Sequence, residues 1–272
     1  MVSAEQKYRR LTEEVKTYDG AVVAFSGGVD SALLLRAARD ALGGRALAAT
    51  LVSQLLLPQE LERARRVARE LGVEHRELIV DLLAIPEVGG NSDDRCFHCK
   101  HVILSSLLEL AQAKGHGIVL EGSHCSDAGE YRPGRQAVRA LGVLSPLQTH
   151  GFTKSDIRRL SCQLGLETWK KPSLPCLATR FPYGSRITPG RLHQVRRGEE
   201  ELGQLGFSSL RLRHHGAIAR LEVGSGELER ALIQRHAIIE VLKRAGFTYV
   251  ALDLEGYRSG SMDEVREQSH CE

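Results

Sequence analysis

Short apolar runs alternate with amphipathic segments along the first 170 residues. The run AVVAF at 21–25 is apolar throughout, as a strand buried on both faces requires, and most of ALAATLVS at 46–53 is apolar too. Between these runs and after them, apolar residues recur at helical spacing, for example from Pro58 to Gly72. Further strands are predicted at 75–80 and 117–122, with a helix after Cys99. Repeated strand–helix units predict an α/β fold with a doubly wound parallel sheet and helices on both faces.

The pattern changes at a proline-bearing segment, KKPSLPCLATRFPYG at 170–184, which is typical of a crossing between domains. Beyond it the predicted elements are a helix near 189–205, a half-buried strand around 211–213, a helix at 227–245 and a last strand at 249–254. This order predicts a smaller C-terminal α+β domain. We place the two domains at 1–180 and 181–272.

The string SGGVDS at 26–31 joins the first predicted strand to a helix. The first N–H groups of a helix lack intrahelical acceptors and lie at its positive end, so they bind anions. Gly27 and Gly28 let the backbone approach a phosphate, Ser26 and Ser31 add hydroxyl groups, and Asp30 can hold Mg²⁺ against the phosphates. The loop has no Walker-A lysine. A glycine–serine turn without a ligand is the alternative, but the residues together predict a nucleotide-phosphate site.

Other loops follow the carboxyl ends of the predicted strands, where ligands of such sheets bind. Ser53 and Gly122 end two of these strands and are predicted to border the nucleotide. In the next loop, GSHCSDAGEYRPGR, Asp127 is placed for a second magnesium contact, and Arg132 or Arg135 could meet a phosphate or carboxylate. The alternative is an ordinary polar loop.

Three cysteines are candidates for chemistry. Cys96 and Cys99 form a C-x-x-C pair around His98, and Cys176 lies in the proline-bearing segment. A single pair is weak evidence for zinc, which is usually bound by four ligands. Three thiolates would leave one iron of a [4Fe-4S] cluster without a protein ligand, open to external sulfide. A redox pair, or unrelated thiols of which only Cys176 is reactive, remain as alternatives.

The bulk composition restricts the class of protein. The 272 residues include 37 Lys plus Arg against 34 Asp plus Glu, a balance too even to indicate nucleic-acid binding by itself. Six cysteines in a chain this long favour reactive thiols or a metal site over a disulfide framework. No stretch has the length and apolarity of a membrane span, and no signal-peptide core is visible at the start. We expect a cytoplasmic protein.

The second domain carries charged residues that suit an anion or a cation. Arg211, Arg213 and Arg258 could form an anion-binding surface, and Glu199 and Glu222 could bind a divalent metal. Solvated charges on a helix and a strand are the alternative for each.

Five strings together carry a resemblance to a known family: AFSGGVDS, EYRPGR, CLATRFPYGSRIT, LRLRHHGAIARLE and YVALDLEGYRSGSM. They resemble LarE, the sulfur-insertion enzymes of nickel-pincer nucleotide biosynthesis, and the first is similar to the PP-loop of the adenine-nucleotide α-hydrolases. The resemblance covers essentially the whole chain. It implies that ATP adenylates a carboxylate of pyridinium-3,5-biscarboxylic acid mononucleotide, that pyrophosphate leaves, and that sulfur then gives a thiocarboxylate. It also implies a homo-oligomer, since family members include homohexamers.

The resemblance also assigns roles by position. It implies ATP contacts for the residues of the SGGVDS loop, a sulfur-bearing role for Cys176, substrate or phosphate contacts for Arg180, Arg211, Arg213 and Arg258, and metal association for Glu199 and Glu222. Single-cysteine members lose the sulfur of that cysteine and keep dehydroalanine. This chain also has Cys96 and Cys99, and so resembles the three-cysteine members proposed to hold a [4Fe-4S] cluster. We expect the cluster type, with a sacrificial Cys176 as the alternative.

Three other functions compete with this interpretation. A PP-loop enzyme that thiolates tRNA also uses ATP, and some of these hold an iron–sulfur cluster on three cysteines. An ammonia-using amide synthase would leave the cysteines without a role. A nucleotide-sensing module would bind ATP without forming AMP.

Overall fold

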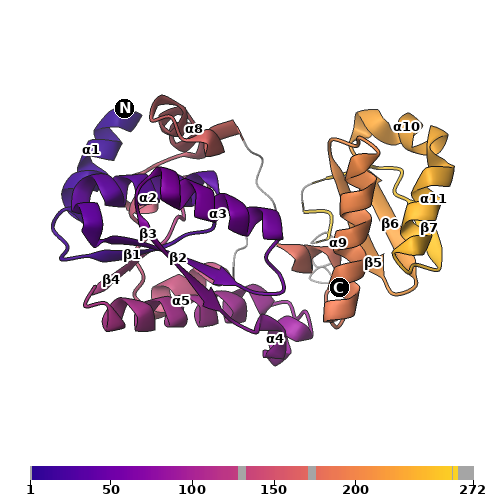
Figure 1. Cartoon of the computed structure of the whole chain (residues 1–272), viewed down its shortest axis with the longest axis horizontal. Coiled ribbons are helices and arrows are strands. Elements are labelled where there is room, and N and C mark those ends of the chain that lie inside the picture. The colour runs from indigo at the N-terminus through magenta and orange to yellow at the C-terminus, as the bar shows by residue number, and fades with distance from the viewer. Residues whose placement is uncertain (1, 128–132, 171–175, 259, 263–272) are drawn as a thin grey trace, which may run out of the picture. The chain divides into compact units, whose positions relative to one another are not determined.

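The computed structural model describes residues 2–127, 133–170, 176–258 and 260–262. The chain separates into two compact units (Figure 1). The first comprises Met1–Ile85 and Asp94–Leu174, and the second comprises Pro86–Asp93 and Pro175–Glu272. The sequence-based division at 180/181 stays a prediction. A short segment near residue 90, which the sequence pattern did not single out, folds with the second unit.

The first unit contains a parallel four-stranded sheet in the order β3-β2-β1-β4, so the predicted α/β fold class is confirmed. Its strands are β1 (Ala21–Ala24), β2 (Ala46–Val52), β3 (Glu74–Ile79) and β4 (Ile118–Leu120). Its helices are α1 (Ala4–Val15), α2 (Val29–Leu42), α3 (Pro58–Glu70), α5 (Arg95–Ala113), α6 (Gly134–Ala140), α7 (Pro146–Thr149) and α8 (Lys154–Gln163).

Both faces of this sheet are covered, which explains the continuous apolar runs. Val23 packs in a core with α1, α2, α3 and α8, whereas its neighbour Val22 packs in a second core with α5 (Figure 1). Successive strand residues point to opposite faces, so a strand between two helix layers must be apolar at every position. The register Val23↔Leu120 brings the ends of β1 and β4 together at the carboxyl edge of the sheet.

Helix α5 begins earlier than the sequence pattern predicts. We expected a helix after Cys99, but α5 starts at Arg95, so the CFHC motif forms its first turn. The polar residues around the motif conceal this start, because they show no apolar periodicity.

The second unit is built on the mixed sheet β5-β6-β7, in which β5 and β6 are antiparallel and β6 and β7 are parallel. Its elements are α4 (Pro86–Gly89), α9 (Pro189–Gln204), β5 (Leu210–His215), β6 (Ile218–Val223), α10 (Leu228–Ile233), α11 (Arg235–Arg244) and β7 (Tyr249–Leu252). The helix predicted over 227–245 is thus two helices. Gly198 lets α9 lie close to β5, since a Cβ there would stand 2.4 Å from Leu212.

Within the described ranges, no helix has both the length and the apolar character needed to cross a lipid bilayer.

Candidate functional site

The SGGVDS loop closes on itself between β1 and α2. The hydroxyl oxygens of Ser26 and Ser31 lie 3.1 Å apart, and the Ser31 hydroxyl donates to the Gly28 carbonyl at 3.2 Å. Gly27 has φ +71°, and a Cβ at this position would lie 3.0 Å from the backbone nitrogen of Ala64. Gly28 is the N-cap of α2 and provides no side chain to the first N–H groups. These N–H groups therefore face a loop shaped for an external anion.

Asp30, in the first turn of α2, pairs with a lysine from a distant part of the sequence. The Lys154 ammonium lies 2.7 and 2.6 Å from the two carboxylate oxygens of Asp30, and His124 Nε2 lies 3.6 Å from one of them. Lys154 is the first residue of α8, after the capping residue Thr153. The loop thus has a cation, the Lys154 ammonium, beside its carboxylate, and this cation suits the negative charge of a phosphate.

Sequence reasoning missed Lys154 and His124, although a signal for the lysine was present. A cation in the first turn of a helix opposes the helix dipole, so Lys154 occupies a position that local energetics disfavour. Such a violation of a local rule commonly marks a functional position. His124 gave no comparable signal, because it stands in a loop next to other polar residues.

Two of the other residues predicted to bind the nucleotide, Gly122 and Ser53, lie in the described part of the first unit. Gly122 follows β4 and lies against the loop, since a Cβ there would be 3.3 Å from the Ser31 nitrogen. Ser53 follows β2 at the same edge of the sheet, and its hydroxyl accepts from the Leu55 N–H at 3.3 Å. The Asp127 side chain and Arg132 lie outside the described residues.

A magnesium ion fits what the described residues offer. Mg²⁺ is usually held by one or two carboxylates together with substrate phosphates, and Asp30 supplies a carboxylate beside the phosphate loop. Across the described part of the chain, no group of three or more His, Cys, Asp and Glu side chains is arranged to hold a metal by itself. A metal at this loop would therefore depend on the nucleotide for its remaining ligands.

The cysteines are distributed over both units. Cys96 and Cys99 lie three residues apart in the first turn of α5, with Cys96 exposed and Cys99 partly exposed. Cys176 is exposed in the second unit, directly before a short 3₁₀ helix, Leu177–Arg180. None of the cysteines described in either unit forms a disulfide.

Arg180 holds the turn that follows Cys176. Its guanidinium is 1% exposed and binds both carboxylate oxygens of Glu199, at 2.9 and 3.1 Å. It also donates to the Thr179 hydroxyl at 3.1 Å, and that hydroxyl donates to the Cys176 carbonyl at 2.8 Å. Arg180 therefore fixes the backbone of the cysteine turn, a contact that the prediction of substrate binding did not include.

Arg213 and Glu222 form a second and deeper pair. They bind through two hydrogen bonds of 2.9 and 2.6 Å, and their side chains are 5% and 0% exposed. Arg213 also donates to the Thr179 carbonyl at 2.8 Å, and Arg220 donates to Glu222 at 3.1 Å. The Arg180–Glu199 and Arg213–Glu222 pairs thus both bind the turn after Cys176, through Thr179. Metal binding by Glu199 and Glu222 stays a prediction, and both carboxylates face guanidinium groups here.

The remaining predicted arginines are placed differently. The Arg211 guanidinium stacks over the Tyr257 ring, 4.8 Å from its centre, and burial, with help from the nearby Arg180, lowers the pKa of Arg211. Arg258 pairs with Glu255 at 2.7 Å. Their roles toward a substrate stay predictions.

The sequence is similar to one family model and to two proteins over nearly their whole length. The NAD synthase family model matches residues 4–87, which include the SGGVDS loop. The chain is 38% identical over 263 residues to the uncharacterized protein slr1717 of Synechocystis, covering 96% of this chain and 98% of that protein. It is 35% identical over 266 residues to the pyridinium-3,5-bisthiocarboxylic acid mononucleotide synthase of Lactiplantibacillus plantarum, covering 97% of this chain and 96% of that one.

A more distant similarity concerns part of the chain. The tRNA-specific 2-thiouridylase MnmA of Heliobacterium modesticaldum is 30% identical over 199 residues, covering 56% of this chain and 49% of that protein. By contrast, the similarity to the mononucleotide synthase extends over both units. This chain belongs to the LarE-like family, which is one family of PP-loop ATP pyrophosphatases. The members of the LarE-like family are ATP-dependent sulfurtransferases.

Proposed function

We propose that this protein inserts sulfur into pyridinium-3,5-biscarboxylic acid mononucleotide at the expense of ATP, for nickel-pincer nucleotide synthesis. The observation that carries the proposal is similarity over 97% of the chain to a protein named for the bisthiocarboxylic product. The phosphate loop at α2 supports it. The competing tRNA-thiolase function is favoured only by the partial similarity to a 2-thiouridylase.

The reaction needs activation because a carboxylate is a poor electrophile. A substrate carboxylate oxygen would attack the α-phosphorus of ATP, and pyrophosphate would leave. The N–H groups at the start of α2 and the Lys154 ammonium beside Asp30 would offset the charge that develops on the phosphates. A sulfur nucleophile would then attack the acyl carbon, and AMP would depart with the original oxygen.

We further propose that Cys96, Cys99 and Cys176 hold a [4Fe-4S] cluster, whose fourth iron would offer a place for external sulfide. The donor chemistry fits, since all three thiols are at least partly exposed.

The function is tested by the products. Purified protein with ATP, Mg²⁺ and the biscarboxylate mononucleotide is expected to release AMP and pyrophosphate only when the mononucleotide is present. Mass spectrometry should then find a thiocarboxylate when sulfide is supplied. Tight, salt-dependent tRNA binding without mononucleotide-dependent AMP would favour the thiolase instead. We also propose a cytoplasmic protein, because the reaction draws on ATP and reduced thiols. The resemblance to LarE implies a homo-oligomer, which we propose here and which sedimentation would test.

Anaerobically purified protein is expected to absorb visible light and to contain iron and sulfide. Replacing Cys96 and Cys99 with serine together should remove most of the iron, because a hydroxyl is a poor ligand for this cluster. Cys162→Ser is the matched control, since Cys162 is also exposed but lies on α8. A colourless, iron-free wild type in which Cys176 becomes dehydroalanine after one turnover would establish the sacrificial mechanism and exclude the cluster.

Lys154→Met is expected to weaken ATP binding by about tenfold, the effect of losing one charge-assisted contact of roughly 1.5 kcal/mol. Calorimetric titration with ATP and Mg²⁺ measures this. Lys114→Met is the matched control, because Lys114, the C-cap residue of α5, forms a pair with Glu74 at 3.2 Å. Equal ATP affinity in both variants would show that Lys154 serves only Asp30.

A further inference from the structure

A lysine of the first helix binds the segment of the chain that carries Lys154. Helix α1 lies beside α8 (Figure 1), and its Lys7 ammonium donates to the Gly151 carbonyl at 2.6 Å and to the Asp156 carboxylate at 2.7 Å. Gly151 stands three residues before Lys154, and Asp156 stands two residues after it. Lys7 therefore joins the two sides of the turn from which the Lys154 side chain leaves. The proposed function leaves Lys7 without a role.

The Lys7–Asp156 pair is partly shielded from water. The two side chains are 17% and 19% exposed. The Lys7 ammonium also lies over the ring of the fully buried Phe152, 6.0 Å from its centre. Burial raises the pKa of Asp156, but Lys7 and the hydrogen bonds from Thr153 outweigh burial and hold this pKa below its ordinary value. Asp156 is therefore ionised at neutral pH, and its bond with Lys7 is one of the stronger, charge-assisted kind.

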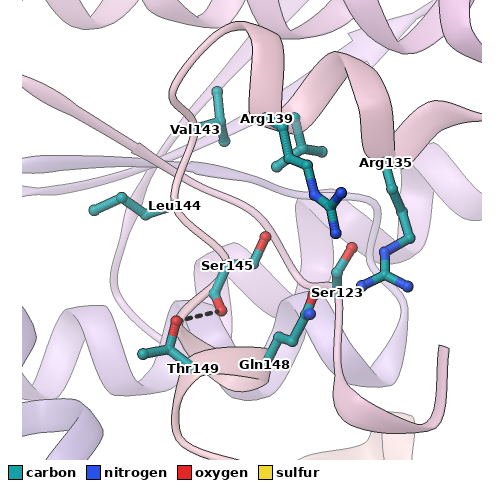
Figure 2. A pocket seen from close by; sticks show the side chains of 9 residues that line it. Ser123, Arg135, Arg139, Val143, Leu144, Ser145, Gln148 and Thr149 are labelled. Carbon is teal, nitrogen blue, oxygen red and sulfur yellow. Dashed lines mark hydrogen bonds between the residues drawn. The ribbon is translucent and has the colours of Figure 1, made fainter. Parts of the chain in front are cut away.

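Helix α7 supports the segment from the side that precedes it. The Thr149 hydroxyl, at the end of α7, donates to the Ser145 carbonyl at 3.3 Å (Figure 2). The Phe152 N–H donates to the Leu147 carbonyl at 2.9 Å. The chain is thus turned back onto α7 just before Thr153 caps α8.

The loop after β4 supports the same segment from a second direction. The Phe152 carbonyl accepts from the Cys125 N–H at 2.9 Å, and the Lys154 N–H donates to the Ser126 hydroxyl oxygen at 3.1 Å. The Lys154 N–H is among the first of α8 and has no intrahelical acceptor, so Ser126 satisfies it. These bonds hold the main chain of residues 152–154. Lys7 adds a charged contact on both sides of Lys154.

The position of Lys154 needs such support. The first turn of a helix lies at the positive end of its dipole, so a cation is repelled there. The Lys154 ammonium is nevertheless held 2.7 and 2.6 Å from the two carboxylate oxygens of Asp30. A turn that moved by about 1 Å would take the ammonium out of hydrogen-bond range unless its side chain rearranged. The contacts that fix this turn therefore decide where the Lys154 charge lies relative to the phosphate loop.

We propose that Lys7 is a positioning residue for ATP. By binding Gly151 and Asp156 it holds the start of α8, so that the Lys154 ammonium meets the phosphates at the SGGVDS loop. Lys7 acts through Lys154 and does not itself contact the nucleotide. This inference rests on the role proposed for Lys154 and deepens it, because it names what holds that lysine in place.

The test is a double-mutant cycle in which calorimetric titration with ATP and Mg²⁺ measures affinity. Lys7→Met is expected to weaken ATP binding by about three- to tenfold, and by no more than Lys154→Met does. The Lys7→Met/Lys154→Met variant should bind ATP like Lys154→Met alone, because the contact that Lys7 positions is already absent. Lys7→Arg should keep most of the wild-type affinity, since a guanidinium keeps the charge and the donors.

Tyr8→Phe is the matched control. It removes a hydrogen bond of 2.9 Å between the neighbouring residue of α1 and Asp40 of α2, and it leaves the contacts of residues 151–156 in place. This variant should bind ATP like wild type. Thermal unfolding shows beforehand that each variant is folded. If Lys7→Met does not fold, Asp156→Asn breaks the same pair from the other side and replaces it in the cycle, with the same results expected.

Four results would overturn the inference. They are wild-type ATP affinity in the folded Lys7→Met variant, losses that add in the double variant, a loss in Lys7→Arg or Tyr8→Phe as large as in Lys7→Met, and wild-type affinity in Lys154→Met. Failure of the proposed function is seen separately. It would appear as no AMP from wild type with ATP and the biscarboxylate mononucleotide, a substrate that the ATP titrations do not use.

Discussion

Cys176→Ser is expected to lower thiocarboxylate formation by on the order of a thousandfold or more, while mononucleotide-dependent AMP release continues. Serine keeps the shape of the side chain but replaces a thiolate, which is both a strong nucleophile and a ligand for iron, with a weakly acidic hydroxyl. The turn itself should persist, because Thr179 binds the backbone carbonyl of residue 176 and not its side chain. The activated carboxylate would then be hydrolysed, giving AMP without a sulfur product.

The measurement follows both products in one reaction, with AMP by chromatography and the thiocarboxylate by mass spectrometry. Cys125→Ser is the matched control, since Cys125 is a partly exposed thiol in the first unit whose Sγ contacts the Gln148 carbonyl at 3.5 Å. Full sulfur transfer by Cys176→Ser would contradict the cluster and the sacrificial mechanisms together. Loss of AMP release as well would mean that Cys176 also takes part in activating the substrate.

The parallel sheet could be predicted because its central strands, β1 and β2, are largely buried on both faces. Val22 and Val23 enter different cores, so the chain must be apolar at both positions, and this leaves a visible run. The loop at 26–31 was visible for a similar reason, since Gly27 adopts a positive φ that other residues avoid. In both cases the local sequence is constrained by local geometry.

The partners of the charged residues could not be predicted. The strings around Arg180 and Arg213 are compatible with a substrate anion or with a buried carboxylate, and the choice depends on side chains 19 and 9 residues away in the sequence. Lys154 meets Asp30 across 124 residues. Such pairs are set by how elements pack, which the order of apolar residues does not encode.

Glu222→Gln is expected to lower the free energy of unfolding of the second unit by about 3–5 kcal/mol. The carboxylate is fully buried between Arg213 and Arg220, so removing its charge leaves Arg213 uncompensated in a place that water does not reach. Arg213 also holds the Thr179 carbonyl, and the cysteine turn should loosen with it. Urea unfolding measures the loss, and proteolysis after Arg180 reports the turn.

Glu240→Gln is the matched control for Glu222→Gln, because Glu240 forms a pair of similar length, 2.9 Å, with Arg244 but is 70% exposed. Exposed pairs contribute at most about 1 kcal/mol, so this variant should unfold close to wild type. Two results distinguish the possible roles of Glu222. If both variants unfold alike and Glu222→Gln loses a divalent-metal requirement, the carboxylate serves a metal, as the sequence resemblance implies. If Arg213→Met/Glu222→Leu recovers most of the stability that Glu222→Gln loses, the loss arises from the unpaired buried charge. The apolar pair fills a similar volume but leaves no charge buried there.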